Sequence, residues 1–136
     1  MRTASWSTAV TVDPGAQFTF GEGAKLTVKE NGGVLTADAG GAETISFVGA
    51  RSAPGHWRAI EIESDDPDNV LDNVEVAHGG SGNWANVWVS EGARATVTNS
   101  LLRDSATHGI VVGADATFDG SDNVHRNNAD GERERR

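Results

Sequence analysis

The chain has 136 residues, the length of one domain, and it has no cysteine, which excludes disulfide bonds and thiol chemistry. Its 11 Lys and Arg residues stand against 20 Asp and Glu residues, for a formal net charge of −9. Because nucleic acids and anionic membranes are bound by clustered cations, we expect neither as a partner, and no apolar run is long enough for a transmembrane helix.

The N-terminal segment, MRTASWSTAV, has no apolar stretch of the kind found at the centre of a secretory signal peptide. We therefore expect either that the protein stays inside the cell or that a signal peptide has been removed. Residues 1–12 are expected to cap the N-terminal end of the domain, with Trp6 as the plug.

Four segments begin with Gly-Ala and then alternate in polarity: GAQFTF (15–20), GAKLTV (23–28), GARATV (92–97) and GADATF (113–118). A period of two is typical of a β-strand with one buried face. The segments ETISFVG (43–49), RAIEIES (58–64), ANVWVSE (85–91) and GIVVGA (109–114) are also expected to be strands, and turns rich in Gly, Asn and Ser separate them. No segment has a convincing helical period, so we predict an all-β protein.

The strands recur at a nearly fixed interval, which indicates a repeat architecture. Val87 and Val89 recur 23 positions later as Ile110 and Val112, and Ile60 lies 27 positions before Val87. Short strands at this interval, three per period, are typical of a parallel β-helix, whose coils stack about 4.8 Å apart. We predict one such domain over residues 1–128, a solenoid of about five coils.

The repeat also predicts how individual residues stack along the helix axis. The copies at 92–97 and 113–118 are expected to stack Ala on Ala, 21 positions apart. The copies that begin at 15 and 23 are too close for a full coil, so we expect them on consecutive sides of one coil. Segment 70–76 (VLDNVEV) aligns with 96–102 (TVTNSLL), and the aligned Asn73 and Asn99 are expected to form an inward ladder.

The C-terminal residues turn charged where another coil would begin. Residues 129–136 (ADGERERR) contain one apolar side chain, so we predict a polar, disordered tail. A β-helix exposes an unpaired rung at an end that has no cap. The uncapped C-terminal rung is therefore a candidate for end-to-end pairing with a second copy of the chain.

The segments DPGAQFTF (13–20), PGHWRAIEIES (54–64) and NVLDNVEVAHGG (69–80) resemble right-handed parallel β-helix repeat proteins of the pectate-lyase-like superfamily. The resemblance covers about residues 10–128. It implies the fold, a location outside the cell or on its surface, and a structural role for Trp57 as a plug. It does not imply an activity, because the matched residues are core and turn residues.

A candidate binding face lies on the predicted strand at 84–90. Trp84, Asn86 and Trp88 share one face by alternation, and this face points outward if the valines between them point inward. Glu61 and Glu63 are expected beside them on the adjacent coil. Tryptophan rings stack on sugar rings while carboxylates accept hydrogen bonds from hydroxyl groups, so this pattern favours glycan binding. Alternatively, the loop HGGSG (78–82) covers the tryptophans.

Candidate catalytic groups are fewer. Glu61 and Glu63 share a face and could act as the carboxylate pair of a glycoside hydrolase. His78 and His108 both precede a glycine in turns that the repeat makes equivalent, so they could contact substrate, act as a general base or share a metal with Asp104. Alternatively, they are turn residues without a chemical role.

Four closely spaced carboxylates make a candidate calcium site in the loop ESDDPDNVLDN (63–73). They belong to Asp65, Asp66, Asp68 and Asp72. Calcium prefers carboxylate and carbonyl oxygen ligands, although the spacing is not that of an EF-hand. The alternative is a solvated acidic loop.

Two functions follow from these features. The first is a non-catalytic extracellular or surface module that binds carbohydrate through an aromatic and acidic face. The second is a small polysaccharide-active enzyme, a pectate-lyase-like lyase or a glycoside hydrolase, with calcium as its candidate cofactor. The motifs of pectate lyases and polygalacturonases are not intact in the chain, which favours the first function.

Overall fold

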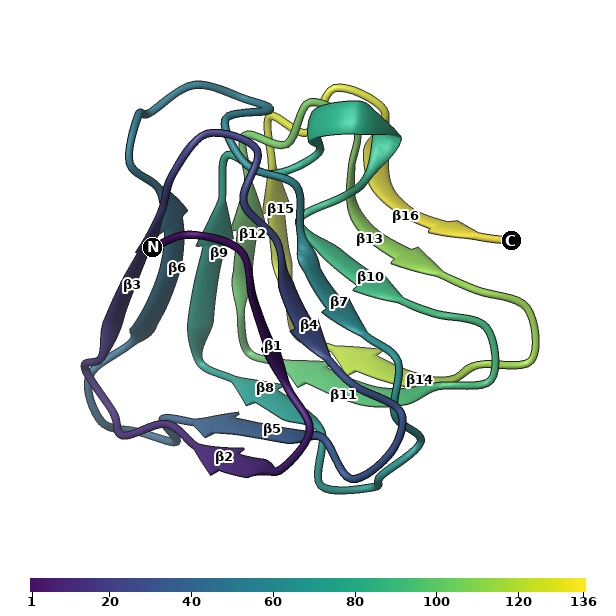
Figure 1. Ribbon diagram of the computed structural model, residues 1–136. Helices are drawn as coiled ribbons and strands as arrows, with labels where there is room; N and C mark the ends of the chain where they lie inside the picture. The colour runs from purple at the N-terminus through teal and green to yellow at the C-terminus, as the bar shows by residue number, and fades with distance from the viewer.

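A computed structural model describes residues 1–136 and shows three parallel β-sheets wrapped around one core (Figure 1). The first sheet, sheet A, contains β1 (Ala4–Trp6), β4 (Leu26–Val28), β7 (Ile60–Ile62), β10 (Val87–Val89), β13 (His108–Val112) and β16 (Gly131–Arg135). Sheet B contains β2 (Ala9–Thr11), β5 (Val34–Asp38), β8 (Val70–Asp72), β11 (Arg94–Thr98) and β14 (Thr117–Ser121). Sheet C contains β3 (Gln17–Phe20), β6 (Ile45–Gly49), β9 (Val74–Ala77), β12 (Leu101–Arg103) and β15 (Val124–Arg126).

Each coil contributes one strand to each sheet, in the order A, B, C, so β1 to β15 make five coils and β16 begins another pass. In Figure 1 the chain runs down β1, across β2 and up β3, and this clockwise path repeats as the coils recede from the viewer, which makes the solenoid right-handed. The predicted all-β parallel β-helix, with about five coils of three strands, is confirmed. The one helical element is a short 3-10 turn, η1 (Ser81–Asn83), and no helix is long and apolar enough to cross a membrane.

The core follows the predicted alternation. Val87 pairs with Ile60 on one side and Ile110 on the other, and all three side chains are buried. The intervening Trp88 lies between Glu61 and Val111 on the outer side of the sheet. The repeat spacing of sheet A and the inward direction of its valines were therefore predicted correctly.

The stacking of the Gly-Ala copies differs from the prediction. Ala95 pairs with Phe118, an offset of 23 positions (118 − 95), and not with Ala116 at an offset of 21. The two offsets differ by two residues, which is the side-chain period of a strand. Both registers therefore bury the same set of side chains, and the turn length before each strand decides between them. The copies that begin at 15 and 23 lead into β3 of sheet C and β4 of sheet A, on consecutive sides as expected.

The predicted inward ladder of Asn73 and Asn99 is wrong. Both residues have left-handed backbone, with φ of 53° and 52°, and Asn99 is exposed. Asparagine tolerates this conformation better than most residues, so it is suited to the corner between two sheets. The expected bonding to neighbouring backbone does hold for Asn73, whose Nδ2 donates to the carbonyls of Gly40 and Ala42 in the preceding coil. Four further asparagines bond the backbone of neighbouring coils: Asn69, Asn86, Asn123 and Asn128.

The N-terminal segment is part of the solenoid. Instead of forming a separate cap, residues 1–12 supply β1 and β2 of the first coil, and Trp6 is half-buried against the core. Trp57 lies inside the coils: it has no exposed surface, its ring stacks on Phe20 with 4.0 Å between centroids, and its Nε1 donates to the carbonyl of Ala77 at 2.7 Å. The structural role expected for Trp57 agrees with this position.

The expected disorder of residues 129–136 is also wrong. Residues 131–135 form β16, which pairs in parallel with β13, and Arg135 donates a side-chain hydrogen bond to the carbonyl of Ala116 at 3.0 Å. The sequence of β16, GERER, has no apolar residue, which is why its pattern predicted no strand. An edge strand needs only one neighbour, and backbone hydrogen bonds to that neighbour do not depend on apolar side chains.

Candidate functional site

Two tryptophans lie together on the outer side of sheet A. Trp88 is the central residue of β10 and points outward because Val87 and Val89 point inward. Trp84 follows η1, and its ring meets that of Trp88 edge to face, with 5.0 Å between centroids and 61° between planes. Both side chains are half-buried. The predicted outward direction of these two residues agrees with the structure.

A cation stands over each of the two rings. The Lys25 Nζ atom lies 4.2 Å from the ring centroid of Trp84, and the Arg136 guanidinium carbon lies 4.8 Å from that of Trp88. Cations are attracted to the negative face of an aromatic ring. These two side chains, rather than the loop at 78–82 alone, therefore cover part of the tryptophan surface.

Glu61 is held firmly within this face. Its carboxylate accepts hydrogen bonds from Thr27 and Ser90, both at 3.2 Å, and forms an ion pair with Lys25 at 2.9 Å. The residue is 8% exposed. A carboxylate with three partners and little exposure holds those partners in place. Its small exposed part can still accept one further hydrogen bond. We call Lys25, Glu61, Trp84 and Trp88 the tryptophan face.

Glu63 lies apart from Glu61. It follows β7 and lines a polar hollow of about 440 Å³ together with Glu30, Asp65 and Glu91, and Glu61 does not line that hollow. The two glutamates are therefore not gathered in one cavity where they could act on one glycosidic bond. The hollow is acidic throughout, and no positive side chain lines it.

Asn86 does not belong to the tryptophan face, and its predicted outward direction is wrong. The residue is fully buried, its Oδ1 accepts from the backbone of Gly79, and its Nδ2 donates to the carbonyls of Val76 and Arg103. β10 begins at Val87, so Asn86 lies in the turn before the strand. The alternation of a strand does not extend into a turn.

The two histidines occupy different surroundings. His78 is 4% exposed, and its Nδ1 accepts a hydrogen bond from the backbone of Gly49 at 3.2 Å. Burial, followed by the nearby Arg103 charge, lowers the pKa of His78 below its ordinary value. His108 begins β13, and its Nδ1 lies 3.4 Å from a carboxylate oxygen of Glu134. The predicted equivalence of the two turns is wrong, because the backbone of His108 pairs with Asn86.

Two of the four predicted calcium ligands, Asp66 and Asp72, are engaged in other contacts. Asp66 accepts from the backbone of Asp68 at 2.8 Å, and Asp72 accepts from the side chains of Thr98 and Asn99 on the next coil. The hydrogen bond from Thr98, more than any other contact, lowers the pKa of Asp72. No three His, Cys, Asp or Glu side chains are placed to hold one metal ion. The loop at 63–73 therefore does not fit a calcium site, and Asp104 is paired with Arg103 at 2.6 Å.

Sequence reasoning missed Lys25, a member of the face, and Arg136, which lies over Trp88. Lys25 follows Ala24 in the alternating segment GAKLTV, so the alternation placed it outward, but nothing placed its coil beside Trp84. Arg136 belongs to the segment for which disorder was predicted. None of the four hollows on the molecule is lined by Trp84, Trp88 or Glu61, so the tryptophan face is an open surface and not a groove.

No family model, curated protein or solved structure matches this chain. What the molecule shares with known proteins is the architecture of a parallel β-helix, which carries many unrelated functions.

Proposed function

We propose that this protein is a non-catalytic β-helix module of the extracellular space or cell surface that binds a glycan through the tryptophan face. The observation that carries the proposal is the edge-to-face pair of Trp84 and Trp88, half-buried on the outer side of a regular parallel sheet. Neighbouring apolar side chains on a protein surface indicate an interaction site more strongly than apolar residues scattered singly. The sequence resemblance further supports a distant relation to the pectate-lyase-like superfamily.

The chemistry of the face suits a sugar. The tryptophan rings offer apolar surfaces for the C–H groups of a pyranose ring. The carboxylate of Glu61 accepts hydrogen bonds and the ammonium of Lys25 donates them, and the two form an ion pair at 2.9 Å. A pair of this kind can bind neighbouring hydroxyl groups of one sugar. Lys25 also moves readily, because its long side chain is flexible, so a sugar can displace it from the Trp84 ring.

An open face of this kind favours binding over catalysis. Glycoside hydrolysis uses two carboxyl groups that flank one glycosidic bond. Glu61 is bonded to three neighbours and Glu63 lines a separate hollow. The alternative function, a small polysaccharide lyase or hydrolase, has no comparable arrangement of side chains in its favour.

The proposal is tested by affinity electrophoresis of the wild type and of Trp88→Ala in gels that contain single polysaccharides. A stacked tryptophan contributes on the order of 1–3 kcal/mol, so Trp88→Ala should weaken retention about tenfold or more. Val124→Ala is the matched control, because Val124 is an apolar residue of sheet C that is 51% exposed. Equal retention of the wild type and Trp88→Ala, with correct folding of both, would show that the face does not bind glycan.

A further inference from the structure

The last rung of the solenoid differs from those before it. The inward positions of sheet A carry four buried aliphatic side chains in a row and then a cation: Leu26, Ile60, Val87, Ile110 and Arg133. The corresponding row of sheet C runs from apolar residues to an imidazole: Phe47, Val76, Leu102 and His125. Polar groups therefore occupy positions that are apolar in the preceding coils.

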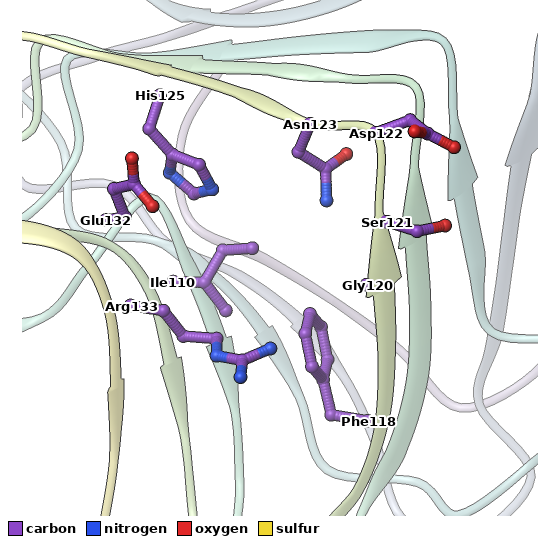
Figure 2. A pocket seen from close by; sticks show the side chains of 9 residues that line it. All are labelled: Ile110, Phe118, Gly120, Ser121, Asp122, Asn123, His125, Glu132 and Arg133. Carbon is purple, nitrogen blue, oxygen red and sulfur yellow. The ribbon is translucent and has the colours of Figure 1, made fainter.

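These two polar groups line the same pocket, of about 280 Å³, at the C-terminal end of the solenoid (Figure 2). Figure 2 shows the His125 ring and the Arg133 guanidinium projecting into the pocket, with Ile110 between them and Phe118 across from Arg133. The side chains of Ser121 and Asp122 point away from it. The pocket thus has an apolar floor, the two nitrogen-bearing groups of His125 and Arg133, and the amide of Asn123, which is already hydrogen-bonded to the backbone of Val97 and Ser100.

Both nitrogen-bearing groups lack a polar partner. The Nδ1 atom of His125 is the one buried side-chain nitrogen or oxygen of the protein without a hydrogen bond. Arg133 takes part in no ion pair, whereas Lys25 and Arg136 each have one and Arg103 has two. Its guanidinium lies over the Phe118 ring, 5.4 Å from the centroid, and this leaves its N–H groups free to bind a ligand.

We propose that this pocket binds a small organic carboxylate. A carboxylate accepts two parallel hydrogen bonds from a guanidinium, so its oxygens would lie against Arg133 and within reach of His125. The apolar part of the ligand would lie against Phe118 and Ile110. Glu132 also lines the pocket and repels a second negative charge, which favours a monoanion over a phosphate or sulfate dianion.

The charges around His125 predict how binding depends on pH. Burial lowers the pKa of His125, the carboxylate of Glu132 raises it and the guanidinium of Arg133 lowers it, so the imidazole is neutral at pH 7 in the free protein. The remaining charged group of the pocket, Asp122, points away. A bound carboxylate favours the imidazolium, so binding takes up a proton. Affinity for a carboxylate that stays ionised should therefore rise as the pH falls from about 7.5 to about 5.5.

The test is an NMR titration of the full chain with sodium benzoate at constant ionic strength, following the imidazole signals of the four histidines. Benzoate should shift the His125 signals along a saturating curve and leave those of His56 unchanged. Arg133→Gln should weaken binding at least tenfold, and Arg126→Gln, which changes an outward cation of β15, should not. His125→Gln should retain binding but lose its pH dependence.

Several results would overturn the proposal. One is a His125 signal shift that increases linearly with benzoate and does not saturate, and another is an unchanged titration curve in Arg133→Gln. A third is sulfate binding as tight as benzoate binding, which would indicate an adventitious ion only, with no preference for a carboxylate. Pairing of β16 with β13 uses backbone groups, so Arg133→Gln should keep the wild-type amide spectrum. If it does not fold, Arg133→Lys takes its place, because it keeps the charge, loses the bidentate geometry and should still weaken binding. This pocket is separate from the tryptophan face, so neither proposal depends on the other.

Discussion

At the scale of single residues, neighbouring positions of one strand have opposite roles. Val89 is fully buried, whereas the adjacent Trp88 lies on the outer side. Val89→Asp buries an unpaired carboxylate, which costs several kcal/mol of a total stability of about 5–15 kcal/mol. We expect Val89→Asp to be largely unfolded and Trp88→Asp to remain folded in urea denaturation. The opposite pair of results would mean that the register is displaced by one residue.

Protonation of His78 should destabilise the fold. Its pKa is lowered in the folded state by burial and by Arg103, so the unfolded chain binds the proton more tightly. The corresponding stability is complete above the unfolded pKa of about 6.5 and is lost as the pH falls below that value. The half-buried His125, whose pKa is also lowered, acts in the same direction.

We therefore expect the midpoint of urea unfolding to decrease between pH 7.5 and pH 5.5. In His78→Asn the decrease should be smaller, and asparagine suits the backbone at this position, where φ is 73°. An equal decrease in both proteins would exclude His78 as its source. Asp72, whose pKa is lowered mainly by Thr98, adds a further loss of stability only at pH values below its ordinary pKa of 3.8.

At the scale of strands and turns, alternation predicted side-chain direction well and turn geometry poorly. The period of two placed Val87, Trp88 and Ile110 correctly because they lie within strands. It failed at Asn86, one residue before a strand begins, and at Asn99, where left-handed backbone redirects the side chain. A polarity pattern predicts which side chains are buried, but it does not predict the backbone angles of the corners between sheets.

The polarity pattern also failed to predict the C-terminal strand. β16 was missed because its partner is supplied by the fold and not by its own side chains. A truncated chain that ends at residue 130 should expose one edge of β13 and part of the buried Ile110 and Val112. We expect a loss of about 2–4 kcal/mol in the free energy of unfolding, measured by urea denaturation. An unchanged free energy of unfolding would instead support the disordered tail.

At the scale of the whole molecule, the two ends of the solenoid differ in chemistry. The first rung presents partly buried apolar side chains, those of Ala4, Trp6, Val10 and Phe18. The last rung carries inward Arg133, Arg135 and His125, and inward charges discourage further strands from pairing with an edge. End-to-end pairing of two copies through the C-terminal rung stays a prediction, and these charges weigh against it.

The candidate site was predicted in part. Sequence repeats placed Trp88 beside Glu61 because the two lie in strands of equal register. They did not reveal Lys25 and Arg136, which reach the tryptophans through side-chain length and not through strand pairing. Nor did they predict an open face without a groove, because the repeat predicts which residues pair between strands but not the shape of the surface.

The central claim, glycan binding without catalysis by the tryptophan face, is tested most directly by incubating the protein with a panel of polysaccharides and measuring retained protein and released products together. We predict retention on at least one polysaccharide, no new reducing or unsaturated chain ends, and loss of retention in the Trp84→Ala/Trp88→Ala double variant. Release of products by the wild type, or an absence of retention on the whole panel, would contradict the claim.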